Sequence, residues 1–190
     1  MKRFFSFLSS ALVLVFFATG VCAEAASWGQ LNQRVAELYQ KGKVADAVKV
    51  AKAALDTAEN EYGPDAPETA LSLNNLALLY KAQTKFAEAE PLYERALAIS
   101  EKLVGKDHPD LTVTLNNLAL LYSAQGKHDK ANKLCDRAIA ILEKAYGKNH
   151  PNVALALEKY AAVKRDAGKK AEAQAMESRA ATIRKNLTPQ

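Results

Sequence analysis

The apolar positions between residues 67 and 104 predict two amphipathic helices. In the first helix the apolar side chains recur at spacings of three and four, so they share one face; they are Leu73, Leu76, Ala77 and Tyr80. The pattern breaks at Gln83-Thr84, and a second helix is expected from about Phe86 until Gly105 stops it. Its inward side chains are expected to be Ala89, Leu92, Tyr93, Ala96, Leu97 and Ile99.

The same pair of helices recurs every 42 residues. The segment 74–80, Asn-Asn-Leu-Ala-Leu-Leu-Tyr, is repeated letter for letter at 116–122. Four further series keep this step: Gly63, Gly105 and Gly147; Pro67, Pro109 and Pro151; Ala47, Ala89, Ala131 and Ala173; and Gly42, Gly126 and Gly168, with Thr84 in the missing place. Self-similarity at this period predicts a stacked array of helix pairs. We expect units at about 27–66, 67–108, 109–150 and 151–187, within an array that covers 24–190.

These residues resemble a known family. The spaced signature of tetratricopeptide repeats is matched by Leu73, Leu76-Ala77, Tyr80, Ala89, Tyr93 and Ala96. The 42-residue unit resembles the long version found in kinesin light chains and in many bacterial proteins. The resemblance implies an all-α, right-handed α-solenoid of four such helix pairs. It also implies a non-enzymatic adaptor or scaffold that binds a partner protein or peptide and needs no cofactor.

The end units depart from the pattern. Arg34 stands in the place of Leu76, Lys164 in the place of Tyr122, and Glu177 in the place of Cys135. Each end of a stacked array meets water instead of a neighbouring unit, so polar substitutions are expected there. We interpret both end units as caps.

The N-terminus has the organisation of a secretory signal peptide. Lys2 and Arg3 precede an apolar run from Phe4 to Phe17, and small residues follow. We expect a signal peptide over residues 1–23, with cleavage after Ala23, and hence export to the periplasm or secretion. Cleavage after Ala25, retention as a membrane anchor and lipidation of Cys22 are the alternatives. After cleavage no segment is expected to insert in a membrane.

The net charge and the number of cysteines argue against a nucleic-acid partner and against an intramolecular disulfide. Without Lys2 and Arg3 the formal charge falls from +5 to +3, and no basic stripe with stacking aromatic residues is present, so a nucleic-acid partner is not expected. Loss of Cys22 leaves Cys135 alone, which excludes an intramolecular disulfide. We expect Cys135 to be a buried core residue, because it takes the place of Tyr93 and has no histidine on the same face to activate it.

The sequence shows no motif typical of an enzyme or of a metal site. His108 and His150 lie one repeat apart in equivalent loops, so they do not converge on one ion; both are expected to cap helices with the prolines that follow them. No glycine-rich phosphate loop, paired carboxylate motif or nucleophile elbow is found. No catalytic residue and no metal ligand is therefore predicted.

The resemblance implies where a ligand would lie. In this family the concave wall consists mainly of first helices, and the groove is lined by their side chains that point away from the buried face. The corresponding residues here are Asn32, Leu71, Asn74, Asn75, Leu78, Lys81, Val113, Asn116, Asn117, Leu120, Lys159 and Arg165. Leu78 and Val113 occupy two of the places where repeats that clamp heat-shock chaperone C-termini carry basic residues, so no such clamp is expected.

The asparagines and cations suggest the chemistry of this groove. Asn32, Asn74 and Asn116 are equivalent and would form a ladder of amides able to hydrogen-bond a peptide backbone. Asn75 and Asn117 have an alternative role, in hydrogen bonds to the backbone or to the adjacent unit. The basic side chains among the groove residues make it mildly basic, which is compatible with an acidic stretch in the partner. Self-assembly of the array into a structural envelope protein is the alternative function.

Overall fold

The computed structural model describes residues 26–187, which form eight α-helices and contain no strand. Their bounds are α1 Trp28–Gln40, α2 Val44–Glu61, α3 Pro67–Ala82, α4 Phe86–Val104, α5 Leu111–Ala124, α6 His128–Tyr146, α7 Pro151–Asp166 and α8 Lys170–Leu187. The expected all-α fold with four helix pairs is confirmed. The segment expected to be a signal peptide, with Cys22, lies outside the described residues.

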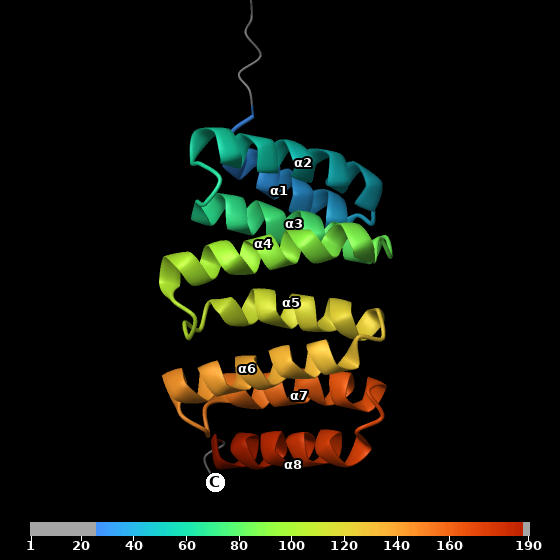
Figure 1. The fold of residues 1–190 in the computed structure, drawn as a ribbon, viewed down its shortest axis with the longest axis vertical. Coiled ribbons are helices and arrows are strands. Elements are labelled where there is room, and N and C mark those ends of the chain that lie inside the picture. The colour runs from blue at the N-terminus through green and yellow to red at the C-terminus, as the bar shows by residue number, and fades with distance from the viewer. Residues whose placement is uncertain (1–25, 188–190) are drawn as a thin grey trace, which may run out of the picture.

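The four pairs are stacked along the long axis of the molecule (Figure 1). Each helix packs against the next one along the chain, and the first helices of neighbouring units also touch, α3 with α5 and α5 with α7. Each unit therefore buries its apolar faces against its neighbours, which is the architecture of a solenoid. The first helices α3, α5 and α7 lie close enough to form one continuous surface.

The turn inside each unit uses a left-handed backbone conformation. Gly42, Gly126 and Gly168 have φ values of 70°, 72° and 75°, whereas Thr84 has φ 59°. Glycine adopts this conformation without steric cost, but a side chain with a Cβ atom is disfavoured there. The second unit therefore carries backbone strain that the other three units avoid.

Histidines stand at two of the turns between units. The Nδ1 atoms of His108 and His150 each accept a hydrogen bond from the backbone N–H two residues later, at 3.3 and 3.2 Å. His150 is the N-cap of α7, which confirms the capping role expected for it. His108 is not the N-cap of α5. That helix begins at Leu111, two residues after Pro109, which is the equivalent of Pro151.

Small residues allow the helices of each pair to approach closely. The alanine series Ala47, Ala89, Ala131 and Ala173 is at most 1% exposed. Tyr93 and Cys135, at equivalent places, are fully buried beside it. The inward face expected for α4 is confirmed for its buried residues, while Leu92 and Leu97 are partly buried and pack against the core.

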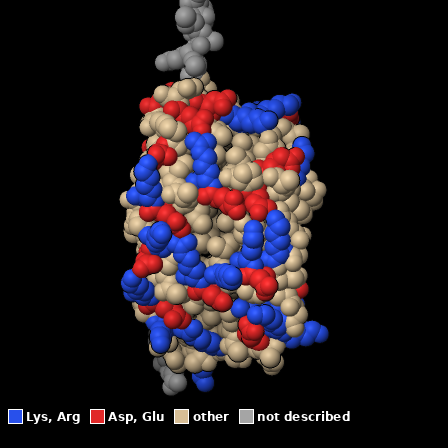
Figure 2. Space-filling model, in the orientation of Figure 1, with Lys and Arg blue, Asp and Glu red and all other residues tan. Residues whose placement is uncertain are grey.

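An arginine of each later second helix joins its unit to the preceding one. The ion pairs are Arg95–Glu59, Arg137–Glu101 and Arg179–Glu143, with N···O distances of 2.5 to 2.6 Å. Each of these arginines also donates to a backbone carbonyl of the loop after the preceding second helix. Figure 2 shows acidic and basic side chains interleaved on one face of the molecule. One repeat before Arg95 the equivalent residue is Ala53, and one repeat after Glu143 it is Lys185. The series of arginine–glutamate pairs therefore stops at both ends.

The interpretation of the end units as polar caps needs one correction. Arg34 and Glu177 are exposed, as a cap requires. Lys164 is only 3% exposed and therefore does not face water. Its ammonium group instead lies 3.0 Å from Glu172 and 3.3 Å from Asp136. The long aliphatic stem fills the space that tyrosine fills in the second and third units, while two carboxylates neutralise its charge.

Candidate functional site

A row of exposed aliphatic side chains runs across the first helices. Leu71 on α3, Val113 on α5 and Leu155 on α7 are 45%, 61% and 45% exposed, and they follow one another at the 42-residue step. Leu71 and Val113 were expected on this surface. Leu155 was not, although one further step from Val113 leads to it. We call these three residues the aliphatic row.

Two clefts lie between the members of this row. The cleft between α3 and α5 has a volume of about 340 Å³ and is lined by Leu71, Asn74 and Val113. Leu103 and Val104, at the end of α4, add two more exposed aliphatic side chains to its wall. The repeat does not predict Leu103, because the equivalent places in the neighbouring units hold Glu61 and Ala145.

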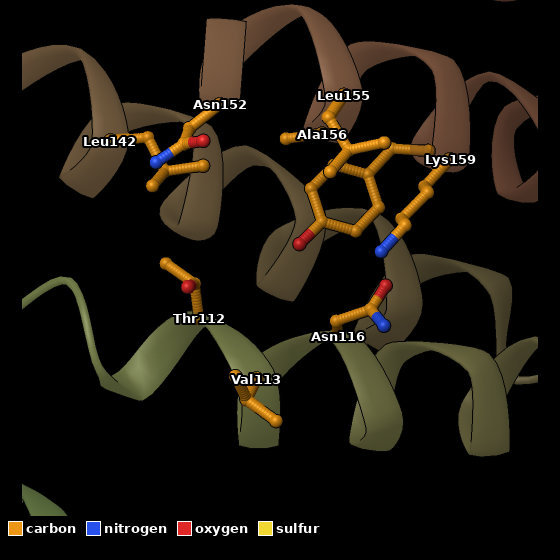
Figure 3. A pocket seen from close by; sticks show the side chains of 9 residues that line it. Thr112, Val113, Asn116, Leu142, Asn152, Leu155, Ala156 and Lys159 are labelled. Carbon is orange, nitrogen blue, oxygen red and sulfur yellow. The ribbon is translucent and has the colours of Figure 1, made fainter. Parts of the chain in front are cut away.

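The cleft between α5 and α7 has a volume of about 210 Å³ and shares Val113 with the first one. Leu155 and Tyr160 of α7 line it together with Val113 and Asn116 of α5. The side chains of Asn116 and Lys159 point toward one another across it (Figure 3). The two clefts therefore occupy successive inter-unit steps, each with one asparagine of the expected amide ladder in its wall.

The asparagines pair across the units instead of forming an open ladder. The Nδ2 group of Asn75 donates to Oδ1 of Asn32 at 3.0 Å, and Nδ2 of Asn117 donates to Oδ1 of Asn74 at 3.4 Å. The alternative considered for Asn75 and Asn117, a bond to the adjacent unit, is thus present. The Oδ1 atoms of Asn32 and Asn74 therefore each accept one hydrogen bond within the array. Their role as ligand contacts stays a prediction.

Asn116 differs from its two equivalents. Its Oδ1 atom is buried and has no hydrogen-bond partner among the described residues. The residue that should donate to it, one step after Asn117, is Lys159. Lys159 is exposed, and no ion pair or hydrogen bond joins it to another described residue. The third inter-unit step therefore lacks the amide pair that closes the other two.

The remaining groove residues are less available than expected. Leu78 and Leu120 are partly buried and pack against the main core cluster. Lys81 is half-buried, and this burial lowers the pKa of its ammonium group. Arg165 forms an ion pair with Glu177 of α8, so its charge is locally balanced. Of the three cations expected to make the groove basic, Lys159 is the exposed one without an acidic partner in the described part of the chain.

Three further kinds of feature are relevant outside the two clefts: the thiol of Cys135, clusters of possible metal ligands, and helices able to span a membrane. Burial raises the pKa of the Cys135 thiol to about 12, so almost no thiolate is present at neutral pH. Within residues 26–187 no group of three or more His, Cys, Asp or Glu side chains is arranged to hold a metal ion. The helices of this region also include none that is both long and apolar enough to cross a membrane.

Comparisons with known proteins agree with this geometry. The family model described as tetratricopeptide repeat matches residues 29–102, 82–134 and 110–186, which together span nearly all of the described chain. No curated protein matches at a significant level. Tetratricopeptide repeats are generally non-enzymatic scaffolds for protein–protein interaction and bind proteins or peptides.

Solved structures show the same fold. BtubC (BKLC) from P. vanneervenii superposes with a TM-score of 0.76 at 26% identity, over 86% of this chain and 66% of that one, so this chain spans slightly less than two thirds of its length. A Podospora anserina kinesin light chain-like protein with nearly identical TPR-like repeats gives 0.75 at 23% identity, over 86% and 77% of the two chains. MamA gives 0.61 at 18% identity, over 86% and 82%. The last two show a shared fold alone.

Proposed function

The chain belongs to the tetratricopeptide repeat family, and on this premise we propose that it is an adaptor that binds a partner protein through a peptide lying across α3, α5 and α7. The observation that carries this proposal is the aliphatic row with its two clefts. Exposed aliphatic side chains recur there in three successive units, at places that the core does not require.

The shape of this surface suits an extended segment. Neighbouring packed helices lie roughly 8–10 Å apart, and an extended chain advances about 3.3 Å per residue. Side chains about three positions apart in a bound peptide would therefore enter successive clefts. Burial of aliphatic side chains in both clefts supplies the binding free energy, at about 25 cal/mol per Å² of apolar surface removed from water.

We further propose that this binding occurs after export, in the periplasm or outside the cell. The support is the N-terminal organisation, in which two basic residues precede the apolar run from Phe4 to Phe17 and a small-residue exit. Cys135, the one cysteine among residues 26–187, suits such a compartment because it is fully buried and offers no accessible thiol for oxidation.

The alternative function, end-to-end self-assembly, has weaker support at the two ends of the array. A second copy stacked on the first would have to continue the arginine pairs of the second helices. The places that would supply them hold Ala53 at one end and Lys185 at the other. Neither residue can provide its half of an arginine–glutamate pair, so each junction would lack a contact that joins every pair of neighbouring units inside the chain.

The test is affinity capture from the native envelope with the wild type and two matched variants. Val113→Asp places a carboxylate between the two clefts, and Ala98→Asp places the same group on the exposed surface of α4. A partner retained by wild type and Ala98→Asp but weakened at least about tenfold by Val113→Asp supports the proposal, since burying an unpaired charge is costly. Partners that Val113→Asp retains in full would contradict it, provided that circular dichroism shows equal helicity.

A further inference from the structure

The three contacts between successive first helices are not equivalent in their polar groups. At the α1/α3 and α3/α5 steps the amide oxygen of one unit is bonded by the asparagine of the next. At the α5/α7 step Lys159 takes the place of that asparagine, and Oδ1 of Asn116 is left buried without a donor. The first two steps can therefore recognise a ligand mainly through apolar contact, whereas the third also offers unmet polar groups.

These polar groups define what the third step can bind. The amide oxygen of Asn116 can only accept, so a ligand can bond it through an N–H or O–H donor. The ammonium group of Lys159 can only donate, and it attracts a carboxylate. Figure 3 shows both groups turned toward one another from opposite walls of the α5/α7 cleft. Val113 and Leu155 line the same cleft. A ligand must therefore present a donor and an anion close together, next to apolar surface.

A peptide with an acidic side chain meets this requirement. Its carboxylate can reach Lys159 while a backbone N–H close to that residue reaches Asn116. Resting on the proposed function, we propose that the α5/α7 cleft selects partner peptides that place an Asp or Glu side chain at Lys159 and a backbone N–H at Asn116. An aliphatic residue about three positions away in the same peptide then occupies the α3/α5 cleft, because that distance matches the separation of packed helices. Discrimination between partners is thus concentrated at one of the three steps.

The chain itself provides a sharp variant for the test. Lys159→Asn restores the residue that closes the other two steps, so it should satisfy Asn116 internally and remove the cation at once. Lys133→Asn removes the same charge from an exposed place on α6 and is the matched control. The probes are nine-residue peptides, acetylated and amidated, with a leucine and an aspartate three positions apart in either order. A second set has asparagine in place of aspartate. Blocked termini ensure that the side chain is the one source of a carboxylate.

Binding to the full chain is measured by fluorescence polarisation. We expect wild type and Lys133→Asn to bind an aspartate probe at least about tenfold more tightly than its asparagine counterpart, as is typical for a hydrogen bond to a charged group. In Lys159→Asn the ratio should fall to below about twofold. Equal binding of both probe sets by wild type would overturn the inference, and so would a ratio that Lys159→Asn leaves unchanged. Absence of saturable binding of either set up to millimolar concentration would overturn it as well.

Two further readouts separate this inference from the proposed function. Equal affinity for both probe sets that is nevertheless lost in Val113→Asp would overturn the acidic specificity and leave the peptide-binding groove intact. The side-chain amide resonance of Asn116, assigned by its loss in Asn116→Ala, should shift when the aspartate probe is added to wild type. In Lys159→Asn this resonance should already be displaced before any peptide is added. If the chemical shift of the Asn116 side-chain amide did not change at a saturating concentration of the aspartate probe, the proposed contact would be contradicted.

Discussion

The ammonium nitrogen of Lys164 lies 3.0 Å from a carboxylate oxygen of Glu172, at a place that tyrosine fills in the two preceding units. Asp136 adds a second contact at 3.3 Å. The lysine side chain is 4% exposed, whereas the side chains of Asp136 and Glu172 are 61% and 51% exposed. One partner of this cluster is therefore desolvated while the other two remain in water.

This asymmetry predicts opposite results for the two ways of breaking the cluster. Lys164→Met keeps a long apolar stem and leaves two solvated carboxylates, so the free energy of unfolding should stay equal or rise. Asp136→Asn combined with Glu172→Gln leaves a buried cation without a counter-charge and should lower the free energy of unfolding. Urea unfolding followed by circular dichroism measures both. If Lys164→Met were less stable than the double variant, the ion pairs would contribute more than the desolvation of the lysine costs.

The pH dependence of the same cluster follows from its pKa shifts. The hydrogen bond from Lys164 lowers the pKa of Glu172 below its ordinary value of 4.5. A lowered carboxyl pKa contributes stability above the unfolded value, and this contribution is lost as pH falls through the folded value. The difference in Tm between wild type and Glu172→Gln should therefore be constant from about pH 5.5 to 9 and shrink in acid.

At the alkaline end the cluster should be lost only beyond the ordinary range of lysine. Burial by itself would lower the pKa of Lys164, but hydrogen bonds and charge from Glu172 and Asp136 outweigh it, so the pKa is raised above 10.5. A raised lysine pKa contributes stability below 10.5 that is lost as pH rises through the folded value. A Tm difference that already changes between pH 6 and 9 would contradict both assignments.

The arginine pairs between second helices should contribute unequally. Arg137 pairs with Glu101 at 2.5 Å and donates to the carbonyl of Lys106 at 2.6 Å, and both charged side chains are less than a third exposed. Lysine cannot make both bonds from one planar group, so Arg137→Lys should lower the free energy of unfolding by about 1 kcal/mol. Arg95→Lys should lower the free energy of unfolding by less, because Arg95 and Glu59 are more exposed. Equal losses in urea midpoint at the two sites would contradict this ranking.

The strained turn of the second unit can be relieved by one substitution. Thr84 has φ 59°, where the other three units have glycine. Thr84→Gly removes the steric cost of a β-branched residue in the left-handed region and should raise the free energy of unfolding by about 1 kcal/mol. Gly126→Thr, the reverse change in the next unit, should lower it by a similar amount. Thermal unfolding of both variants tests the assignment, and a destabilised Thr84→Gly would refute it.

The buried thiol should react only when the array opens. With the pKa of Cys135 raised to about 12, the thiolate fraction at pH 8 is roughly one part in ten thousand. Maleimide labelling of the native protein at pH 8 should therefore be slow and should accelerate in parallel with unfolding as urea is added. Rapid labelling without denaturant would show that the place of Cys135 between the helices is open to solvent.

Much of the fold follows from local features of the sequence. Apolar spacings of three and four place Leu73 and Leu76 on one helix face, and Gly105 ends α4 where the pattern stops. These features depend on residues within a few positions of one another, so a periodic sequence reports them directly. The aliphatic row can also be inferred from the sequence, because Leu155 lies one 42-residue step after Val113, as Val113 does after Leu71.

Contacts between units depend on geometry that no local pattern contains. The pair Arg137–Glu101 joins residues 36 positions apart on two different helices, α4 and α6, so the spacing within one helix does not predict it. Whether Asn74 faces a ligand or Asn117, and whether Lys164 meets water or two carboxylates, depends on how one unit is rotated against the next. The sequence by itself determined the helices, their pairing and the period of the array. The rotation between stacked units, set by side-chain packing over whole helix faces, decided which polar groups are satisfied internally and which are left for a partner.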